Sequence, residues 1–97
     1  MSRNPIRAYL FQEGELWVAQ ALEVDVAVQG VTRADVLHKL GTALRAYFIA
    51  WIAGASALPE PAPAHFEELF KKAPSARKLT LAVGVSVSIS TGDKQLE

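Results

Sequence analysis

The 97-residue chain contains no cysteine, which excludes disulfide bonds, thiolate nucleophiles and metal sites that need cysteine ligands. It also lacks an excess of charge of either sign. Ten Lys and Arg residues balance ten Asp and Glu residues, so the formal net charge is zero. Phosphate binding normally needs a strong positive field, and direct DNA binding is therefore not expected.

Long hydrophobic runs are missing as well. No stretch approaches the roughly 20 apolar residues that span a bilayer, and no basic segment followed by an apolar run marks a secretory signal. We therefore expect a cytoplasmic protein that does not enter a membrane. Residues 1–97 are too few for two cores, so one domain is expected. An apolar share of 51% is high for so short a chain, and this favours self-association.

Three short apolar segments within the first thirty residues are typical of strands. They cover residues 6–11 (IRAYLF), 16–22 (LWVAQAL) and 26–29 (VAVQ). Gly14 lies in the polar break between the first two segments, where a hairpin turn is expected. The short connections predict antiparallel pairing of consecutive strands.

A change of hydrophobic period predicts a long helix from Arg33 to about Ala53. Thr32 is suited to cap its N-terminus, with Asp35 placed to reach back as in a capping box. Gly54 is suited to end the helix. The expected apolar face consists of Val36, Leu37, Leu40, Ala43, Leu44, Tyr47, Phe48 and Trp51.

The rest of the chain predicts a linker, a short helix and one more strand. Residues 55–63 (ASALPEPAP) are rich in proline and are expected to form a linker. Apolar residues at helical spacing predict a short helix over 64–72, and strict alternation over 79–90 predicts a half-buried strand. The fold class is therefore α+β, in the order β-β-β-α-(short α)-β. We expect an antiparallel sheet with one main helix packed on one face.

Residues suited to catalysis or metal binding are few and scattered. A two-metal site needs several converging carboxylates, and the first and last expected strands contain none. Glu23 and Asp25 fall in a loop, and Asp35 is expected at the helix cap. His38 and His65 have neither cysteine nor a second histidine nearby. We therefore expect no catalytic residue, no metal site and no cofactor, and not an enzyme.

The segment from Tyr9 to Phe48 combines a hairpin carrying Trp17-Val18-Ala19 with a Gln29-Gly30-Val31-Thr32 step into a helix. In this it resembles the N-terminal domain of HicB-family antitoxins. The resemblance implies a partial ribonuclease H-like fold, self-association, and binding of a HicA-type toxin, which is a small basic ribonuclease. Many members of that family carry a C-terminal DNA-binding domain. The residues after Ile89 are too few to form one, so a stand-alone domain is expected.

Two surfaces are candidates for interaction. The last turns of the long helix are apolar nearly all round, and the polar face of the last strand carries serines. The expected oligomer interface, of a dimer or tetramer, is Ile49, Trp51, Ile52, Ser86 and Ser88. An acidic surface would suit a basic toxin. Its expected members are Glu13, Glu15, Glu23 and Asp25.

The leading hypothesis is thus an interaction module that self-associates and binds a HicA-type toxin. Two alternatives stay open. One is an orphan structural oligomer without a toxin. The other is a small-molecule or nucleic-acid binder that uses an open face of the sheet.

Overall fold

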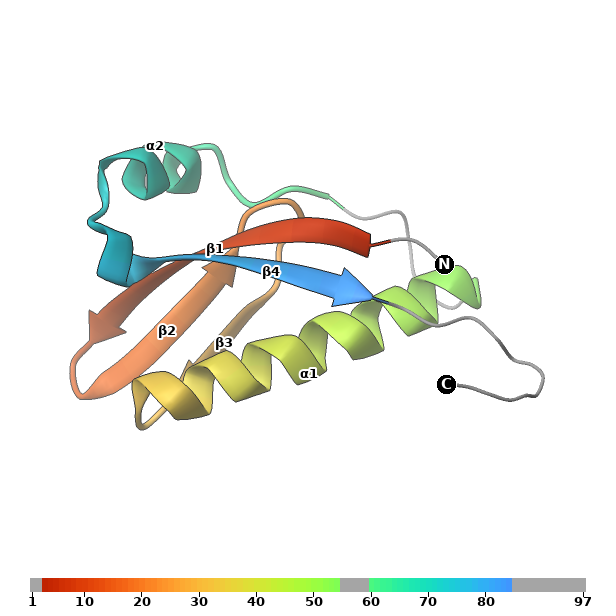
Figure 1. Ribbon diagram of the computed structural model, residues 1–97, viewed down its shortest axis with the longest axis horizontal. Coiled ribbons are helices and arrows are strands. Elements are labelled where there is room, and N and C mark those ends of the chain that lie inside the picture. The colour runs from red at the N-terminus through yellow and green to blue at the C-terminus, as the bar shows by residue number, and fades with distance from the viewer. Residues whose placement is uncertain (1–2, 55–59, 85–97) are drawn as a thin grey trace.

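The computed structural model of the chain describes residues 3–54 and 60–84 (Figure 1). Its elements confirm the α+β order expected from the sequence. They are β1 (Arg3–Glu13), β2 (Leu16–Ala21), β3 (Ala27–Gly30), α1 (Arg33–Ile52), α2 (His65–Lys72), a 3₁₀ turn η1 (Ser75–Arg77) and β4 (Lys78–Gly84). No helix within the described residues is long and apolar enough to span a membrane.

The four strands form one antiparallel sheet in the order β3-β2-β1-β4. A tight turn joins β1 to β2, and Gly14 adopts a φ of 64° there, in the left-handed region that favours glycine. The first strand is longer than the predicted 6–11, because β1 pairs with β2 at one end and with β4 at the other. It is the central strand to which every later element of the sheet adds directly or through β2.

One face of the sheet is covered by α1, which runs diagonally below it in Figure 1. Four side chains spaced four residues apart are buried along the helix: Val36, Leu40, Leu44 and Phe48. They pack on a sheet face whose centre is made of small residues. Ala8, Ala19 and Ala21 are all fully buried there, beside Ile6 and Leu10. Because alanine takes little space, the helix can approach the sheet closely enough for its leucines to fill the gap.

The ends of α1 agree with the sequence prediction. The backbone N–H of Asp35 donates to the Thr32 hydroxyl (3.0 Å), and the Asp35 carboxylate accepts from the N–H of Val31 (3.1 Å). The Asp35 pKa is lowered, first by that backbone N–H and then by contact with Lys39. At the other end Gly54 has a φ of 79° and follows the last helical residues as a C-terminal glycine.

Gly30 is required by a close approach between β3 and α1. A Cβ added there would lie 2.8 Å from the backbone N of Val36 and 2.7 Å from the Asp35 carboxylate. Neither the helix start nor its cap can move away without losing the hydrogen bonds just described. The Gln29-Gly30-Val31-Thr32 step is therefore explained by the geometry of a strand entering a helix.

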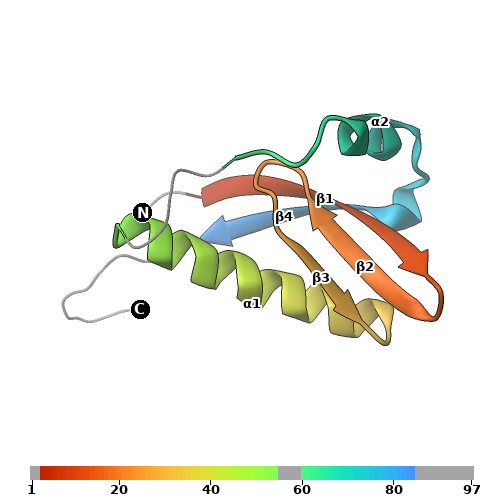
Figure 2. The same ribbon diagram turned by 180° about the vertical axis from the view of Figure 1, so that it is seen from behind.

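The opposite face of the sheet is covered in part by α2, so that the sheet lies between the two helices (Figures 1 and 2). The proline-rich segment was predicted to be a linker, and its described residues 60–63 form no helix or strand and lie against the loop after β2. The N–H of Ala62 donates to the carbonyl of Leu22 (3.0 Å), and the N–H of Asp25 donates to the carbonyl of Glu60 (2.8 Å). Backbone pairing of this kind is invisible in composition. Of the strand predicted over 79–90, residues 85–90 lie outside the described residues.

We predict that Leu44→Ala destabilises the protein by about 2–5 kcal/mol, because the substitution leaves a cavity between α1 and the sheet. Urea unfolding followed by far-ultraviolet circular dichroism measures the change. Thr42→Ala is the matched control, because Thr42 is exposed on the same helix and should shift the free energy of unfolding by about 0.5 kcal/mol or less. Similar losses in both variants would contradict the assigned core.

Candidate functional site

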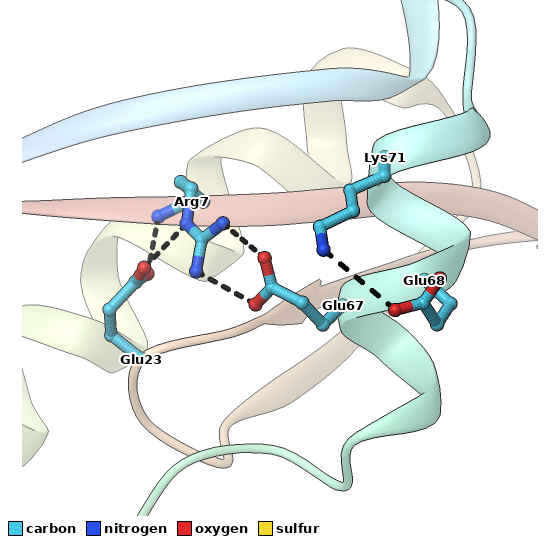
Figure 3. Close-up of polar contacts among 5 residues, drawn as sticks. All are labelled: Arg7, Glu23, Glu67, Glu68 and Lys71. Atoms are coloured by element: carbon cyan, nitrogen blue, oxygen red, sulfur yellow. Dashed lines mark hydrogen bonds and ion pairs between the residues drawn. The ribbon is translucent and has the colours of Figure 1, made fainter.

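The most heavily bonded polar group of the described chain is the guanidinium of Arg7, which bridges two carboxylates (Figure 3). Its Nε donates to Glu23 Oε2 at 2.6 Å. Its two terminal nitrogens donate to the two oxygens of Glu67, at 2.6 and 2.9 Å. This second pair is bidentate, a geometry that arginine provides and lysine cannot. Side chains from three separate segments are thereby held together.

The alternation of β1 explains where Arg7 points. Ile6, Ala8 and Leu10 face α1, so Arg7 and Tyr9 face the other side of the sheet. The regular β1–β2 pairing ends at Ala8 and Ala21. Beyond that point the backbone N–H of Arg7 donates to Glu23 Oε1 (2.7 Å). The Glu23 carboxylate thus supplies the acceptor that the backbone of β2 no longer provides.

Aromatic contacts hold α2 over this point of the sheet. The ring centroids of Phe66 and Phe11 are 6.5 Å apart. The Arg7 guanidinium and the Lys78 ammonium each lie 5.4 Å from the centroid of the Phe70 ring. None of the α2 side chains is fully buried. Since an isolated helix of eight residues is unstable in water, α2 depends on these contacts and on the Arg7–Glu67 pair.

Two more carboxylates lie close to this arrangement. Asp25 accepts a hydrogen bond from the amide nitrogen of Gln20 (3.0 Å), whose side chain is buried. The backbone of Asp25 is also bonded to Glu60, which brings the proline-rich segment alongside. We call Glu23, Asp25, Glu60 and Glu67 the acidic cluster. Glu23 and Glu67 pair with Arg7, whereas Asp25 and Glu60 are exposed and form no ion pair within the described residues.

An open depression of about 460 Å³ lies beside the acidic cluster. Its lining is mostly apolar, with Glu67 at its rim. The lining residues are Leu22, Pro61, Ala62, Pro63, Ala64 and Glu67. An apolar depression with one carboxylate in its lining and others on the adjoining segments suits a side chain with an aliphatic stem and a cationic head, such as lysine or arginine.

The hydrogen bonds between Arg7 and its two carboxylate partners shift the pKa values of this group. The bonds from Arg7 lower the pKa of Glu67 below its ordinary value. The bonds to Glu67 and then Glu23 raise the pKa of Arg7 further above its already high value. Glu67 therefore stays ionised at neutral pH and bonded to Arg7, and it is poorly placed to accept a proton from a substrate.

The structure separates the acidic surface predicted from the sequence into two parts. Glu23 and Asp25 follow one end of β2, whereas Glu13 and Glu15 flank the turn at its other end. Six residues of strand lie between the two pairs, a distance of roughly 20 Å. The four carboxylates thus do not form one surface.

Sequence reasoning missed Glu60 and Glu67 as companions of Glu23 and Asp25. Their partners lie far away in sequence, with 60 positions between Arg7 and Glu67. One signal was available: Arg7 is the lone cation in the segment 6–11, and a half-buried charge in a strand needs a partner.

The predicted oligomer interface is also divided by the structure. Ile49 and Ile52 remain 52% and 47% exposed near the end of α1. Trp51, by contrast, is half-buried and packs against the core. Ser86 and Ser88 lie outside the described residues.

Histidines and metal ligands add nothing to the site. His38 is exposed on α1, and the His65 ring lies 4.2 Å from the ring of Phe66. Within residues 3–54 and 60–84, no group of three or more His, Asp or Glu side chains could hold a metal ion.

Comparison with known proteins adds no assignment. No family model matches the chain, and neither the curated proteins nor the solved structures contain a significant match. The functional argument therefore depends on the geometry of the chain itself.

We predict that Glu67→Gln lowers the urea midpoint at pH 7 and that this effect shrinks as the pH is lowered below the ordinary glutamate pKa of 4.5. The pKa of Glu67 is lowered in the folded protein, so its contribution to stability is present above its ordinary value of 4.5. That contribution disappears as the pH falls through the lower folded-state value, where wild type and variant become alike.

Glu68→Gln is the matched control for this measurement. Glu68 is the next residue on α2, and it pairs with Lys71 at 3.8 Å on an exposed surface. Such a pair contributes little. If Glu67→Gln behaves like Glu68→Gln at pH 7, the proposed importance of the Arg7–Glu67 pair is wrong.

Proposed function

We propose that this chain is a protein-interaction domain of the HicB-like antitoxin type, which self-associates and binds a small basic toxin protein through the acidic cluster. One observation carries the toxin-binding part. Segments from the β2–β3 loop, the proline-rich stretch and α2 converge beside an apolar depression, and they contribute two carboxylates paired with Arg7 and the exposed Asp25 and Glu60.

The acidic cluster is complementary in charge to a basic partner protein. A HicA-type toxin is small and basic, so a surface with excess carboxylates attracts it over long range and accelerates association. The apolar depression then offers burial for an aliphatic stem, which exposed charge alone does not provide. Charge and shape together favour a protein partner with exposed lysine or arginine side chains.

The same arrangement argues for binding without catalysis. Glu23 and Glu67 are both committed to hydrogen bonds with Arg7. Asp25 is bonded to the buried amide of Gln20. In this proposal the carboxylates supply a fixed electrostatic surface, and none of them acts as a general acid or base.

Two further features support the HicB-like proposal. The order β-β-β-α-β fits the fold that the resemblance implies. The apolar end of α1 also leaves Ile49 and Ile52 in solvent, as a self-associating domain requires. The alternative of a ligand on an open sheet face has less room, because α2 covers part of that face.

The test begins with the genes beside this one, among which the proposal expects a short reading frame that encodes a basic protein. In the proposal its product arrests growth when expressed alone, and coexpression of this chain restores growth and forms a complex. If no such neighbour exists, or if growth stays arrested in the presence of a soluble chain, toxin neutralisation is wrong.

For the binding surface we predict that Asp25→Asn with Glu60→Gln weakens the complex roughly tenfold, mainly through slower association, and reduces its salt dependence. Glu13→Gln with Glu15→Gln is the matched control, because it removes the same charge at the opposite end of β2. Surface plasmon resonance at two salt concentrations measures both pairs. Equal effects from the two pairs would rule out the acidic cluster as the contact surface.

A further inference from the structure

The two edges of the sheet differ in how they are protected. The β3 edge is only four residues long, and the ammonium of Lys39 donates to the carbonyl of Gln29 at 3.3 Å. Short edges whose backbone groups are already occupied resist pairing with other chains. This edge is closed by the chain's own side chains.

Within residues 3–54 and 60–84, no side chain protects the β4 edge in this way. The strand is seven residues long and contains neither proline nor any charge after Lys78. In the described part of the chain β4 pairs with β1 alone. The alternating sequence also continues without a charge from Val85 to Ser90. Long, uncharged edges are the ones that pair with another strand.

The hydrogen-bond pattern shows which backbone groups face outward. The N–H of Leu22 donates to the carbonyl of Arg7, so the backbone of Arg7 faces the β2 side. The backbone of Ala8 then faces β4, where its register partner is Leu79. The backbone of Thr80, one residue further, therefore faces away from the sheet, and its side chain is exposed.

An apolar surface accompanies this edge. The α1 helix contacts β4, and in both views β4 ends beside the C-terminal half of α1 (Figures 1 and 2). Ile49 and Ile52 are about half exposed on those last turns. Backbone hydrogen bonds along β4 and apolar contacts from α1 are thus available on the same side of the molecule.

We propose that β4 pairs antiparallel with β4 of a second copy across a two-fold axis, which joins two sheets into one of eight strands with both α1 helices on the same face. Across a two-fold axis, the same surface of each copy contacts its counterpart on the other copy. When the pairing is centred on Leu81, Lys78 of each copy lies opposite Gly84 of the other. The two Lys78 side chains, one from each β4, therefore lie at opposite ends of the paired strands. A chain of zero net charge adds no long-range repulsion.

This proposal deepens the self-association part of the proposed function and is independent of toxin binding. Arg7 points to the sheet face opposite α1, and the acidic cluster gathers beside β2. Pairing along the β4 edge leaves that cluster accessible. The two surfaces can therefore be tested separately.

Light scattering of the full chain over a range of concentrations is the first experiment. The wild type and Thr80→Val are expected at twice the chain mass, because both keep the outward N–H of residue 80. Thr80→Pro removes that N–H without removing a hydrogen bond to β1, and it is expected to be a monomer. A monomeric wild type at about 100 µM, where a specific dimer of ordinary affinity is formed, overturns the proposal. So does a folded Thr80→Pro that remains a dimer.

Hydrogen exchange of the wild type provides a second readout that needs no substitution. The amide of residue 80 is expected to be protected at high concentration and to exchange at least tenfold faster on dilution to monomer. Rapid exchange at every concentration overturns the pairing. A monomer that still binds the neighbouring basic protein refutes the β4 interface alone, whereas a dimer that binds no such protein leaves the β4 interface standing and contradicts toxin binding.

Discussion

The Arg7 guanidinium determines how the second half of the chain meets the first. It lies on the central strand β1 and bonds Glu23 from the loop after β2 and Glu67 from α2. The hydrophobic core beneath α1 forms without it, but that core covers only one face of the sheet. On the other face, a helix of eight residues with no fully buried side chain depends on the Arg7–Glu67 pair together with the contacts of Phe66 and Phe70. Arg7 therefore sets where Glu23 and Glu67 meet.

The two candidate surfaces arise from different physical needs. The acidic cluster forms because Arg7 bonds Glu23 and Glu67, while a backbone hydrogen bond joins the exposed Asp25 and Glu60 beside an apolar depression. A four-stranded sheet has two edges, and among the described residues Lys39 bonds the backbone of the β3 edge, whereas β4 pairs with β1 alone. In our proposals the first surface binds a partner of opposite charge and the second binds another copy of the chain.

The elements could be predicted from the sequence because each depends on local patterns. The cap at Thr32, the buried stripe of α1 and the turn at Gly14 need only neighbouring residues, and the structure confirms them. The site could not be predicted in the same way. It depends on a bidentate bond between Arg7 and Glu67, and no periodicity relates residues so distant in sequence. Glu13 and Glu23 are near each other in sequence and were therefore predicted to share one surface, but β2 lies between them.

The most direct measurement is hydrogen exchange, residue by residue, on Arg7→Lys. Lysine keeps the charge but cannot bond two carboxylates in the same geometry. The account predicts at least tenfold faster exchange in residues 65–72, while the amides of α1 around Leu40 and Leu44 keep their protection. Unchanged protection of α2 would contradict the account, because α2 would then be held without the arginine. Loss of protection in both helices would contradict it too, since Arg7 would then support the core itself.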